Sequence, residues 1–195
     1  MHDKLKTEIG SFVNSGVWYG GFRTGYSQKR NQKGLEEYLR TQLTPSMVTL
    51  EIGCGGGQWS KEIAQHVGSL YCVDVLSEDH NHFWQFVGDN NRNKIDYFCV
   101  DNFELDDIPD NSLDYVFSYD VLCHISSSGV NNYLKALSRK CKRGCILNLM
   151  YADVYKYIKN EPENVGAFIN EFGTDDIPTL QRRMQDDHDG QPNIV

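Results

Sequence analysis

Three glycines at alternating positions follow a short apolar segment in the first half of the chain. Gly53, Gly55 and Gly57 come directly after residues 48–52, and apolar residues at helical spacing resume beyond them. A strand, a glycine turn and a helix bring backbone N–H groups close to a ligand. Glu51 places a carboxylate beside the turn. A carboxylate stabilises a cationic ligand and opposes a pyrophosphate, so these residues favour binding of a positively charged cofactor.

The spacing of the glycines also distinguishes this turn from the dinucleotide fingerprint. That fingerprint reads Gly-x-Gly-x-x-Gly, and its third glycine would fall on Gln58. The spacing therefore disfavours an oxidoreductase with a nicotinamide or flavin cofactor, which is the weakest alternative.

Carboxylates follow the next two apolar segments as well. Asp74 ends the segment 69–74, where a carboxylate can accept hydrogen bonds from two ribose hydroxyls. Asp101 follows the segment 95–100 and opens an acidic loop. The carboxyl ends of parallel strands share one edge of a sheet, so we expect these groups to lie around one ligand. The alternatives are a helix cap for Asp74 and a solvated loop for Asp101.

The sequence Glu51-x-Gly53-x-Gly55-x-Gly57 resembles motif I of the class I S-adenosylmethionine-dependent methyltransferases. The resemblance extends over residues 48–150. It implies S-adenosyl-L-methionine as the cofactor and S-adenosyl-L-homocysteine as its product. In that family the acidic residue at the strand end lies near the positively charged methionine portion. The implied cofactor-binding residues are Glu51, Gly53, Cys54, Gly55, Gly57, Trp59, Asp74, Val75, Asp101, Asn102, Phe103 and Tyr119.

The resemblance also assigns roles to these strand ends. Asp74 would hold the ribose, Asp101 would accept from the adenine amino group, and Phe103 would lie on the adenine face. The segment 118–125 is similar to motif IV of small-molecule O-methyltransferases, including sugar-directed ones, which often carry an acidic or amide residue and then a histidine.

Two residues of this segment are the expected catalytic groups. His124 is the first candidate for the base that takes the acceptor proton, and Asp120 is the second. A packed histidine is the alternative for His124. The Asn/Asp-Pro-Pro-Tyr/Phe tetrapeptide of amide and base methylation is absent, because 118–121 reads Ser-Tyr-Asp-Val. A protein-directed or nitrogen-directed methyltransferase is therefore disfavoured, and no metal is expected.

Aromatic residues alternate with glycines near the N-terminus. Trp18, Tyr19, Arg23 and Tyr26 suit a lid that closes over cofactor and acceptor. An arm that packs its aromatic rings on the domain surface is the alternative.

The order of the predicted elements indicates an α/β fold. Apolar segments predict strands at 48–52, 69–74, 95–100, 113–118 and 144–150, and helical spacing predicts helices at 4–13, 32–42, 58–66, 80–87 and 130–140. This pattern is typical of a Rossmann-like, doubly wound, mostly parallel sheet with helices on both faces.

The chain divides into three predicted segments. Residues 1–45 form an N-terminal arm that serves as the lid, 46–150 form the S-adenosylmethionine-binding core, and 151–195 form a polar, helical C-terminal segment. A full class I sheet has two further strands after the fifth, and 151–195 shows none of comparable strength. A truncated chain or a non-catalytic cofactor-binding module is therefore the main alternative to an active enzyme.

Composition restricts the partners. The net charge of −8 and pI near 5.2 argue against a nucleic-acid substrate. No apolar run has the length of a membrane span and no signal peptide is evident, so a cytoplasmic location without a membrane partner is expected. The six cysteines match no zinc spacing and suit buried free thiols. The adjacent Cys123 and His124 are a poor catalytic dyad. A small-molecule acceptor is the expected partner, and a homodimer is left open.

Overall fold

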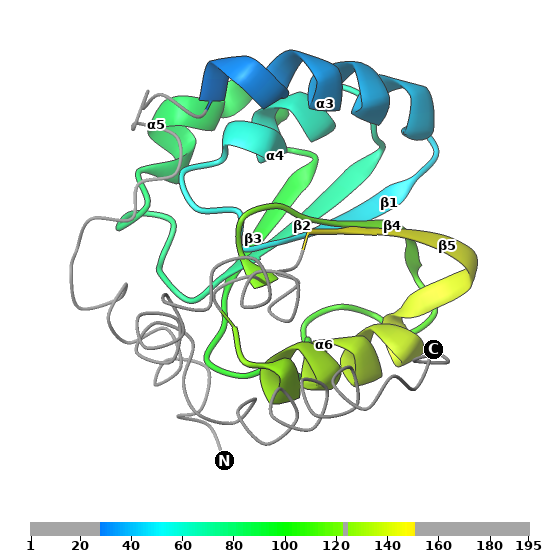
Figure 1. Ribbon diagram of the computed structural model, residues 1–195. Helices are drawn as coiled ribbons and strands as arrows, with labels where there is room; N and C mark the ends of the chain where they lie inside the picture. The colour runs from blue at the N-terminus through cyan, green and yellow to red at the C-terminus, as the bar shows by residue number, and fades with distance from the viewer. Residues whose placement is uncertain (1–27, 123–124, 151–195) are drawn as a thin grey trace, which may run out of the picture.

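A parallel sheet forms the centre of the computed structural model, which describes residues 28–122 and 125–150. The strand order is β3-β2-β1-β4-β5 (Figure 1), and every neighbouring pair in this sheet is parallel. The strands are β1 (Val48–Ile52), β2 (Ser69–Asp74), β3 (Ile95–Cys99), β4 (Leu113–Ser118) and β5 (Cys141–Leu149). The order reverses between β1 and β4, and in such sheets ligands bind beyond the carboxyl ends at this reversal.

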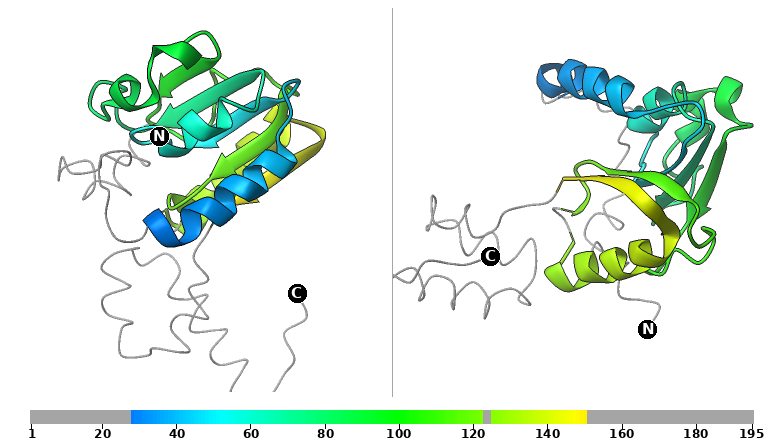
Figure 2. Two further views of the ribbon diagram at one scale, coloured as in Figure 1. Left: turned by 90° about the horizontal axis from the view of Figure 1, so that it is seen from above. Right: turned by 90° about the vertical axis from the view of Figure 1, so that its right-hand side faces the viewer.

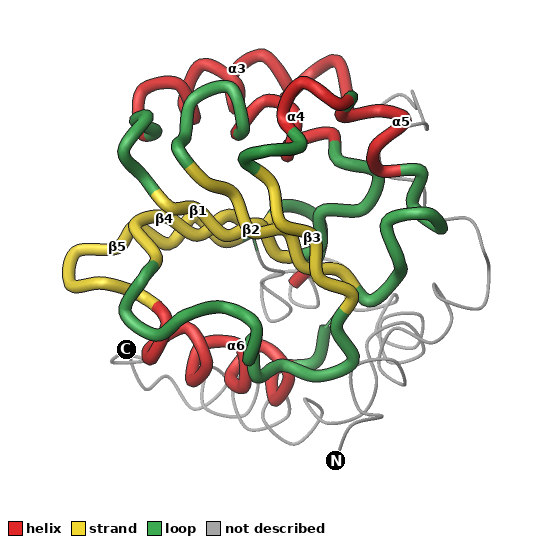
Figure 3. Tube along the Cα trace, turned by 180° about the vertical axis from the view of Figure 1, so that it is seen from behind, coloured by secondary structure: helices red, strands yellow, loops and turns green. Residues whose placement is uncertain are grey.

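Helices cover both faces of the sheet. One face carries α3 (Gln28–Gln42), α4 (Gln58–Ile63) and α5 (Phe83–Val87), and the other carries α6 (Ser127–Lys140), as Figure 1 and the view from behind in Figure 3 show. A short 3₁₀ helix, η1 (Asp89–Asn91), precedes β3. The two further views in Figure 2 show the same layers, with α3 and α6 on opposite sides of the sheet. The predicted doubly wound α/β fold is confirmed.

Each face has its own hydrophobic core. On the face of α3 and α4 the buried residues include Leu39, Leu43, Ile63, Leu70, Phe83, Tyr115 and Phe117. On the face of α6 they include Leu50, Ile52, Val73, Leu113, Val116, Tyr133 and Leu137. The side chains of β1 alternate between the two cores, and Glu51 therefore points into the core beneath α4 although it is a carboxylate.

Several element ends differ from the sequence prediction for local reasons. Helix α5 begins at Phe83, because His82 before it has a φ of 51° and leaves the helical region. Helix α6 begins at Ser127, and Ser126 caps it by accepting a hydrogen bond from Gly129 N at 3.1 Å, as its residue type predicts.

Strand β5 begins at Cys141, directly after α6, rather than at Gly144. A bulge lies between its first pairing, with Leu113, and the pairing of Ile146 with Tyr115. Gly144 adopts a φ of 87° within this bulge. Of the basic residues near this junction, Arg139 and Lys140 lie in the last turn of α6, and Lys142 and Arg143 lie at the start of β5.

Some predicted segments lie outside the described residues. These are the N-terminal helix at 4–13 and the C-terminal segment 151–195, so the predicted division into three segments stays a prediction. Within the described residues, no helix is long and apolar enough to cross a membrane.

Candidate functional site

The glycine turn connects β1 to α4 in a conformation that excludes side chains. Gly53, Gly55 and Gly57 have φ values of 74°, 50° and 86°, in the left-handed region that glycine adopts without strain. A Cβ atom on Gly53 would overlap the side chain of Val121, and one on Gly57 would overlap that of Val87. Glycine is thus required at 53 and 57 both by backbone conformation and by space.

Asp74 ties the end of β2 to this turn. Its Oδ2 accepts a hydrogen bond from the Gly55 amide at 2.9 Å, and its Oδ1 accepts one from the Leu76 amide at 2.9 Å. Burial raises the pKa of Asp74, although these amide hydrogen bonds oppose the shift. The structure therefore places Asp74, the residue predicted to bind the ribose, against the glycine turn. Ribose binding itself stays a prediction.

Glu51 lies beneath the turn with 2% of its surface exposed. Its Oε2 accepts a hydrogen bond from Ser60 Oγ of α4 at 2.5 Å and a weak one from the Cys72 thiol at 3.9 Å. Burial and, to a smaller extent, the nearby Asp74 carboxylate raise the pKa of Glu51 to about 8, against the opposing hydrogen bonds of Ser60 and Cys72. Two acidic groups thus border the turn, and neither forms an ion pair within the described residues.

Further polar side chains lie within and beneath the glycine turn. Cys54 is 5% exposed. Burial, followed by the neighbouring Cys72, raises the pKa of its thiol. The group therefore stays protonated and unreactive. Tyr97 donates a hydrogen bond to Leu76 O at 2.8 Å and accepts one from Asn81 Nδ2 at 2.9 Å. Asn81 Oδ1 is buried and has no hydrogen-bond partner among the described residues.

The segment after β4 packs directly on the turn. The ring of Tyr119 lies 5.4 Å from that of Trp59 in α4, measured between ring centroids. Asp120 is exposed and has a φ of 59°, which is uncommon outside glycine. Val121 contacts Gly53, as noted above. The structure therefore brings Asp120 next to the predicted cofactor-binding residues.

The third strand end is less well matched to its prediction. Asn102 Nδ2 donates to Asp101 Oδ1 at 3.1 Å, and Asn102 Oδ1 accepts from the Glu104 amide at 2.8 Å, so both side chains shape the loop. Phe103 is 4% exposed and packs edge-to-face on Tyr133 of α6, with 4.9 Å between centroids. The ring of Phe103 belongs to the core of the α6 face, and its predicted contact with the adenine stays a prediction.

Other predicted site residues fall outside the described part of the chain. These are His124, Trp18, Tyr19, Arg23 and Tyr26. Val75, which is described, follows Asp74 and packs on the core of the α6 face. In residues 28–122 and 125–150, no three His, Cys, Asp or Glu side chains gather as a metal site would require.

Sequence reasoning missed the residues that support the site from behind. Ser60 could have been found, because it lies three residues before the buried Ile63 and a polar residue on a buried helix face needs a partner. Val121 and Asn81 carry no such signal, since only the tertiary structure brings them to the turn.

The model of a family described as "Methyltransferase domain" matches residues 50–149, more than half of the 195 residues. The chain belongs to this family. The match begins within β1 and ends with β5, so it covers the turn and all five strands. A search of curated protein sequences found no match.

Solved structures with the same fold include several enzymes. A complex of DhpI with SAH has a TM-score of 0.62 at 15% identity, covering 80% of this chain and 72% of DhpI. The PH0226 protein from Pyrococcus horikoshii OT3 has a TM-score of 0.60 at 18% identity, covering 78% and 71%. An rRNA methylase from Streptococcus thermophilus has a TM-score of 0.51 at 16% identity, covering 71% and 81%. At these identities the likeness concerns the fold.

The cofactor of this methyltransferase is S-adenosylmethionine, and the site described above is chemically suited to it. The glycine turn lies at the carboxyl end of β1, where ligands of such sheets bind, and the missing side chains at Gly53 and Gly57 let Val121 and Val87 pack on it. The buried carboxyl groups of Glu51 and Asp74 lack a cationic partner among the described residues, and the cofactor carries a sulfonium and an ammonium. We expect Asp74 to bind the ribose and the turn to contact the methionine portion.

Proposed function

We propose that this methyltransferase moves the methyl group of S-adenosylmethionine to a hydroxyl oxygen of a small molecule. The observation that carries the proposal is the position of Asp120. Its carboxylate is exposed at the carboxyl end of β4, next to Val121, which packs on Gly53 of the cofactor turn. An exposed acceptor group beside a buried cofactor turn is the arrangement that a hydroxylated substrate requires.

The backbone at Asp120 supports a functional role for this residue. A φ of 59° in a non-glycine residue costs on the order of 1–3 kcal/mol and persists where the surroundings impose it. The neighbouring contacts impose it here, through Tyr119 on Trp59 and Val121 on Gly53. Such strained residues cluster at active sites.

The residues of the chain have two tasks in this reaction. The bound cofactor supplies an electrophilic methyl group on a sulfonium. The chain must align the acceptor with that methyl and take up the hydroxyl proton. We propose that Asp120 accepts a hydrogen bond from the acceptor hydroxyl. We assign the proton to His124, four residues further along, as the sequence predicts.

Charge supports a small acceptor over a nucleic acid. The chain carries a net charge of −8, and Asp120 adds a negative group where an RNA backbone would have to approach.

Another DhpI structure is described as a complex with SAM and HEP, with a TM-score of 0.62 at 14% identity, covering 83% of this chain and 72% of DhpI. The same fold also occurs in an rRNA methylase and in the [4+2]-cyclase SpnF, so both macromolecular methylation and a non-methylating reaction need a direct test.

The test is transfer of a radiolabelled methyl group from S-adenosylmethionine to panels of hydroxylated small molecules, amines, peptides and total RNA. We expect label in the hydroxylated panel, with rates reduced about 10²-fold or more in Asp120→Asn and in His124→Ala. The control is Asp89→Asn, an exposed aspartate of η1. Label in RNA or peptides, or unchanged rates in both variants, would overturn the proposal.

The cytoplasmic location and the homodimer also remain proposals. The location is supported by the cysteines at 54, 72, 141 and 145, which form no disulfide within the described residues. Fractionation of the native host would test it, and recovery in a membrane or secreted fraction would contradict it. Light scattering of the purified chain measures its mass, and a monomer at micromolar concentration would exclude the homodimer.

A further inference from the structure

Glu51 is the most deeply buried acidic group beside the cofactor turn. Its side chain lies between β1 and α4 with 2% of its surface exposed, and its Oε2 is fixed by Ser60 Oγ at 2.5 Å. The hydrogen bond from a hydroxyl stabilises a carboxylate less than a cation would. Glu51 therefore lies in a position where an ionised carboxylate is costly unless a positive charge comes near.

Among the described residues, none of the titratable groups around Glu51 is a cation; burial and Asp74 raise its pKa, whereas the hydrogen bonds from Ser60 and the Cys72 thiol lower it. From β2 these groups are Cys72, whose thiol lies 3.9 Å from Oε2, and Asp74. From the turn it is Cys54, which interacts with Glu51 electrostatically. Helix α4 contributes Ser60, which has no charge, and Phe117 of β4 pairs with Glu51 in the sheet register. Burial and Asp74 together raise the pKa of Glu51 to about 8, so the free protein holds this carboxyl protonated at neutral pH.

S-adenosylmethionine and S-adenosylhomocysteine, the two expected ligands of this site, differ in charge at the sulfur atom. S-adenosylmethionine carries a sulfonium, whereas S-adenosylhomocysteine carries a neutral thioether in the same place. A positive charge within about 4–6 Å lowers the pKa of a carboxyl by roughly 1–3 units. Glu51 is the penultimate residue of β1, and ligands of such a sheet bind beyond the carboxyl end of this strand.

We propose that Glu51 senses the charge of the ligand: it releases its proton to the solvent when S-adenosylmethionine binds and keeps that proton when S-adenosylhomocysteine binds. The ionised carboxylate then stabilises the sulfonium form specifically. As the methyl group leaves, the positive charge disappears and Glu51 takes up a proton again. The residue thereby favours substrate cofactor over product, and it does so more strongly as the pH rises.

Calorimetric titration measures this proton directly. Each ligand is titrated at pH 7 into the full chain in buffers of different ionisation enthalpy, so that the slope of the binding enthalpy reports the protons released. We expect about half a proton or more per S-adenosylmethionine and close to none per S-adenosylhomocysteine, since the pKa of Glu51 falls by roughly 1–3 units. The ratio of the two affinities should rise about fivefold or more between pH 5.5 and 8.5.

Two variants separate Glu51 from other sources of the proton. Glu51→Gln keeps an oxygen for Ser60 and resembles the protonated carboxyl, so it should fold, bind both ligands and release no extra proton. Glu62→Gln is the matched control on α4, because Glu62 pairs with Arg40 and His66 on the other side of that helix. The α-amino group of each ligand titrates near pH 7.7–8, and this contribution persists in Glu51→Gln and is subtracted.

The outcomes are distinct. Equal proton release for both ligands would overturn the inference, because the sulfonium would then not be the trigger. A difference in proton release between the two ligands that persists in Glu51→Gln would also overturn it and assign the proton to another group. Failure of the folded protein to bind either ligand would refute cofactor binding itself. None of these results depends on the identity of the acceptor, so the proposed oxygen-directed function is tested separately.

Discussion

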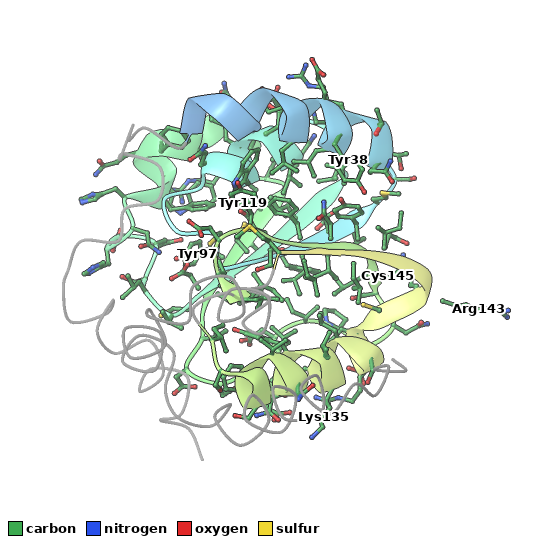
Figure 4. The ribbon with its side chains drawn as sticks, viewed as in Figure 1. Tyr38, Tyr97, Tyr119, Lys135, Arg143 and Cys145 are labelled. Carbon is green, nitrogen blue, oxygen red and sulfur yellow. The ribbon has the colours of Figure 1, made fainter. Side chains whose placement is uncertain are left out.

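Two carboxylates at opposite ends of the sheet, Asp114 and Glu51, differ in how they are stabilised. At the amino end, Asp114 of β4 accepts hydrogen bonds from Lys142 Nζ at 2.8 Å to both oxygens, and from the Val48 amide at 2.9 Å. At the carboxyl end, Glu51 of β1 receives only hydroxyl and thiol donors. Figure 4 shows Tyr97 and Tyr119 near the carboxyl end and Cys145 and Arg143 at the other, where Arg143 extends away from the body.

The pKa values follow this difference. Partial burial alone would raise the pKa of Asp114, but the hydrogen bonds from Lys142 and Val48 lower it overall. Burial raises the pKa of Glu51 to about 8 because no cation compensates it within the described residues. Within the described residues, the chain supplies a counterion for Asp114 and none for Glu51, where we propose that a cationic ligand binds.

The largest expected effect comes from the glycine turn. In Gly53→Ala the new Cβ overlaps Val121, and alanine must adopt a φ of 74°. We expect a loss of about 2–5 kcal/mol in the free energy of unfolding, from left-handed strain and overpacking, and at least a tenfold loss of S-adenosylmethionine affinity. Urea unfolding and calorimetric titration measure the two quantities.

A matched glycine shows that position matters. A Cβ on Gly34, within α3, meets nothing within 4 Å. Gly34→Ala should therefore stabilise the protein by about 0.5–1 kcal/mol and leave cofactor affinity unchanged. Equal effects of the two substitutions would refute the assignment of the turn as a sterically closed site.

The next effect is the dependence of stability on pH at the carboxyl end. The folded protein holds the Glu51 proton up to about pH 8, whereas the unfolded chain loses it near pH 4.5. The unfolded state thus binds fewer protons between these values, and stability falls as the pH rises through this window. We expect Glu51→Gln to remove on the order of 1–4 kcal/mol of this decline.

Urea unfolding at pH 5.5, 7 and 8.5 without ligand measures this decline. Glu51→Gln should match the wild-type protein at pH 5.5 and exceed it at pH 8.5. Parallel stability curves for the two proteins would show that Glu51 is not the group that titrates.

The smallest effect is expected at the amino end. Asp114→Asn removes the ion pair with Lys142 but keeps an acceptor for the Val48 amide, and the side chain of Asp114 is 26% exposed. We expect a loss of about 0.2–1 kcal/mol at pH 7 and no change in cofactor affinity. Because the folded pKa of Asp114 is lowered, this difference should vanish as the pH falls through the range where Asp114 is protonated. A change in cofactor affinity would contradict the division between the two ends.

The sequence predicted the sheet well because its strands are short, apolar and bounded by turn residues. The segments 48–52, 69–74 and 113–118 match β1, β2 and β4 residue for residue. The bulge before Gly144 was missed, since register depends on the partner strand and not on local pattern.

The site was predicted unevenly for the same reason. Asp74 and the glycines were identified from spacing along the chain, and the structure brings them together. The packing of Phe103 on α6 was not predicted, because its partner Tyr133 lies 30 positions further along the chain. Ser60 could have been found from its position on the buried face of α4, whereas Val121 comes from another element and carries no local signal.

The contact between Gly53 and Val121 has a consequence for variation in this family. A side chain larger than valine at position 121 would press on the turn, and any side chain at position 53 would displace valine. The two positions therefore constrain each other, although 68 residues separate them in the chain. In related sequences with the same geometry, we expect residue size at these two positions to covary. The segment after β4, which carries Asp120 and Val121, would then change only in ways that the glycine turn tolerates.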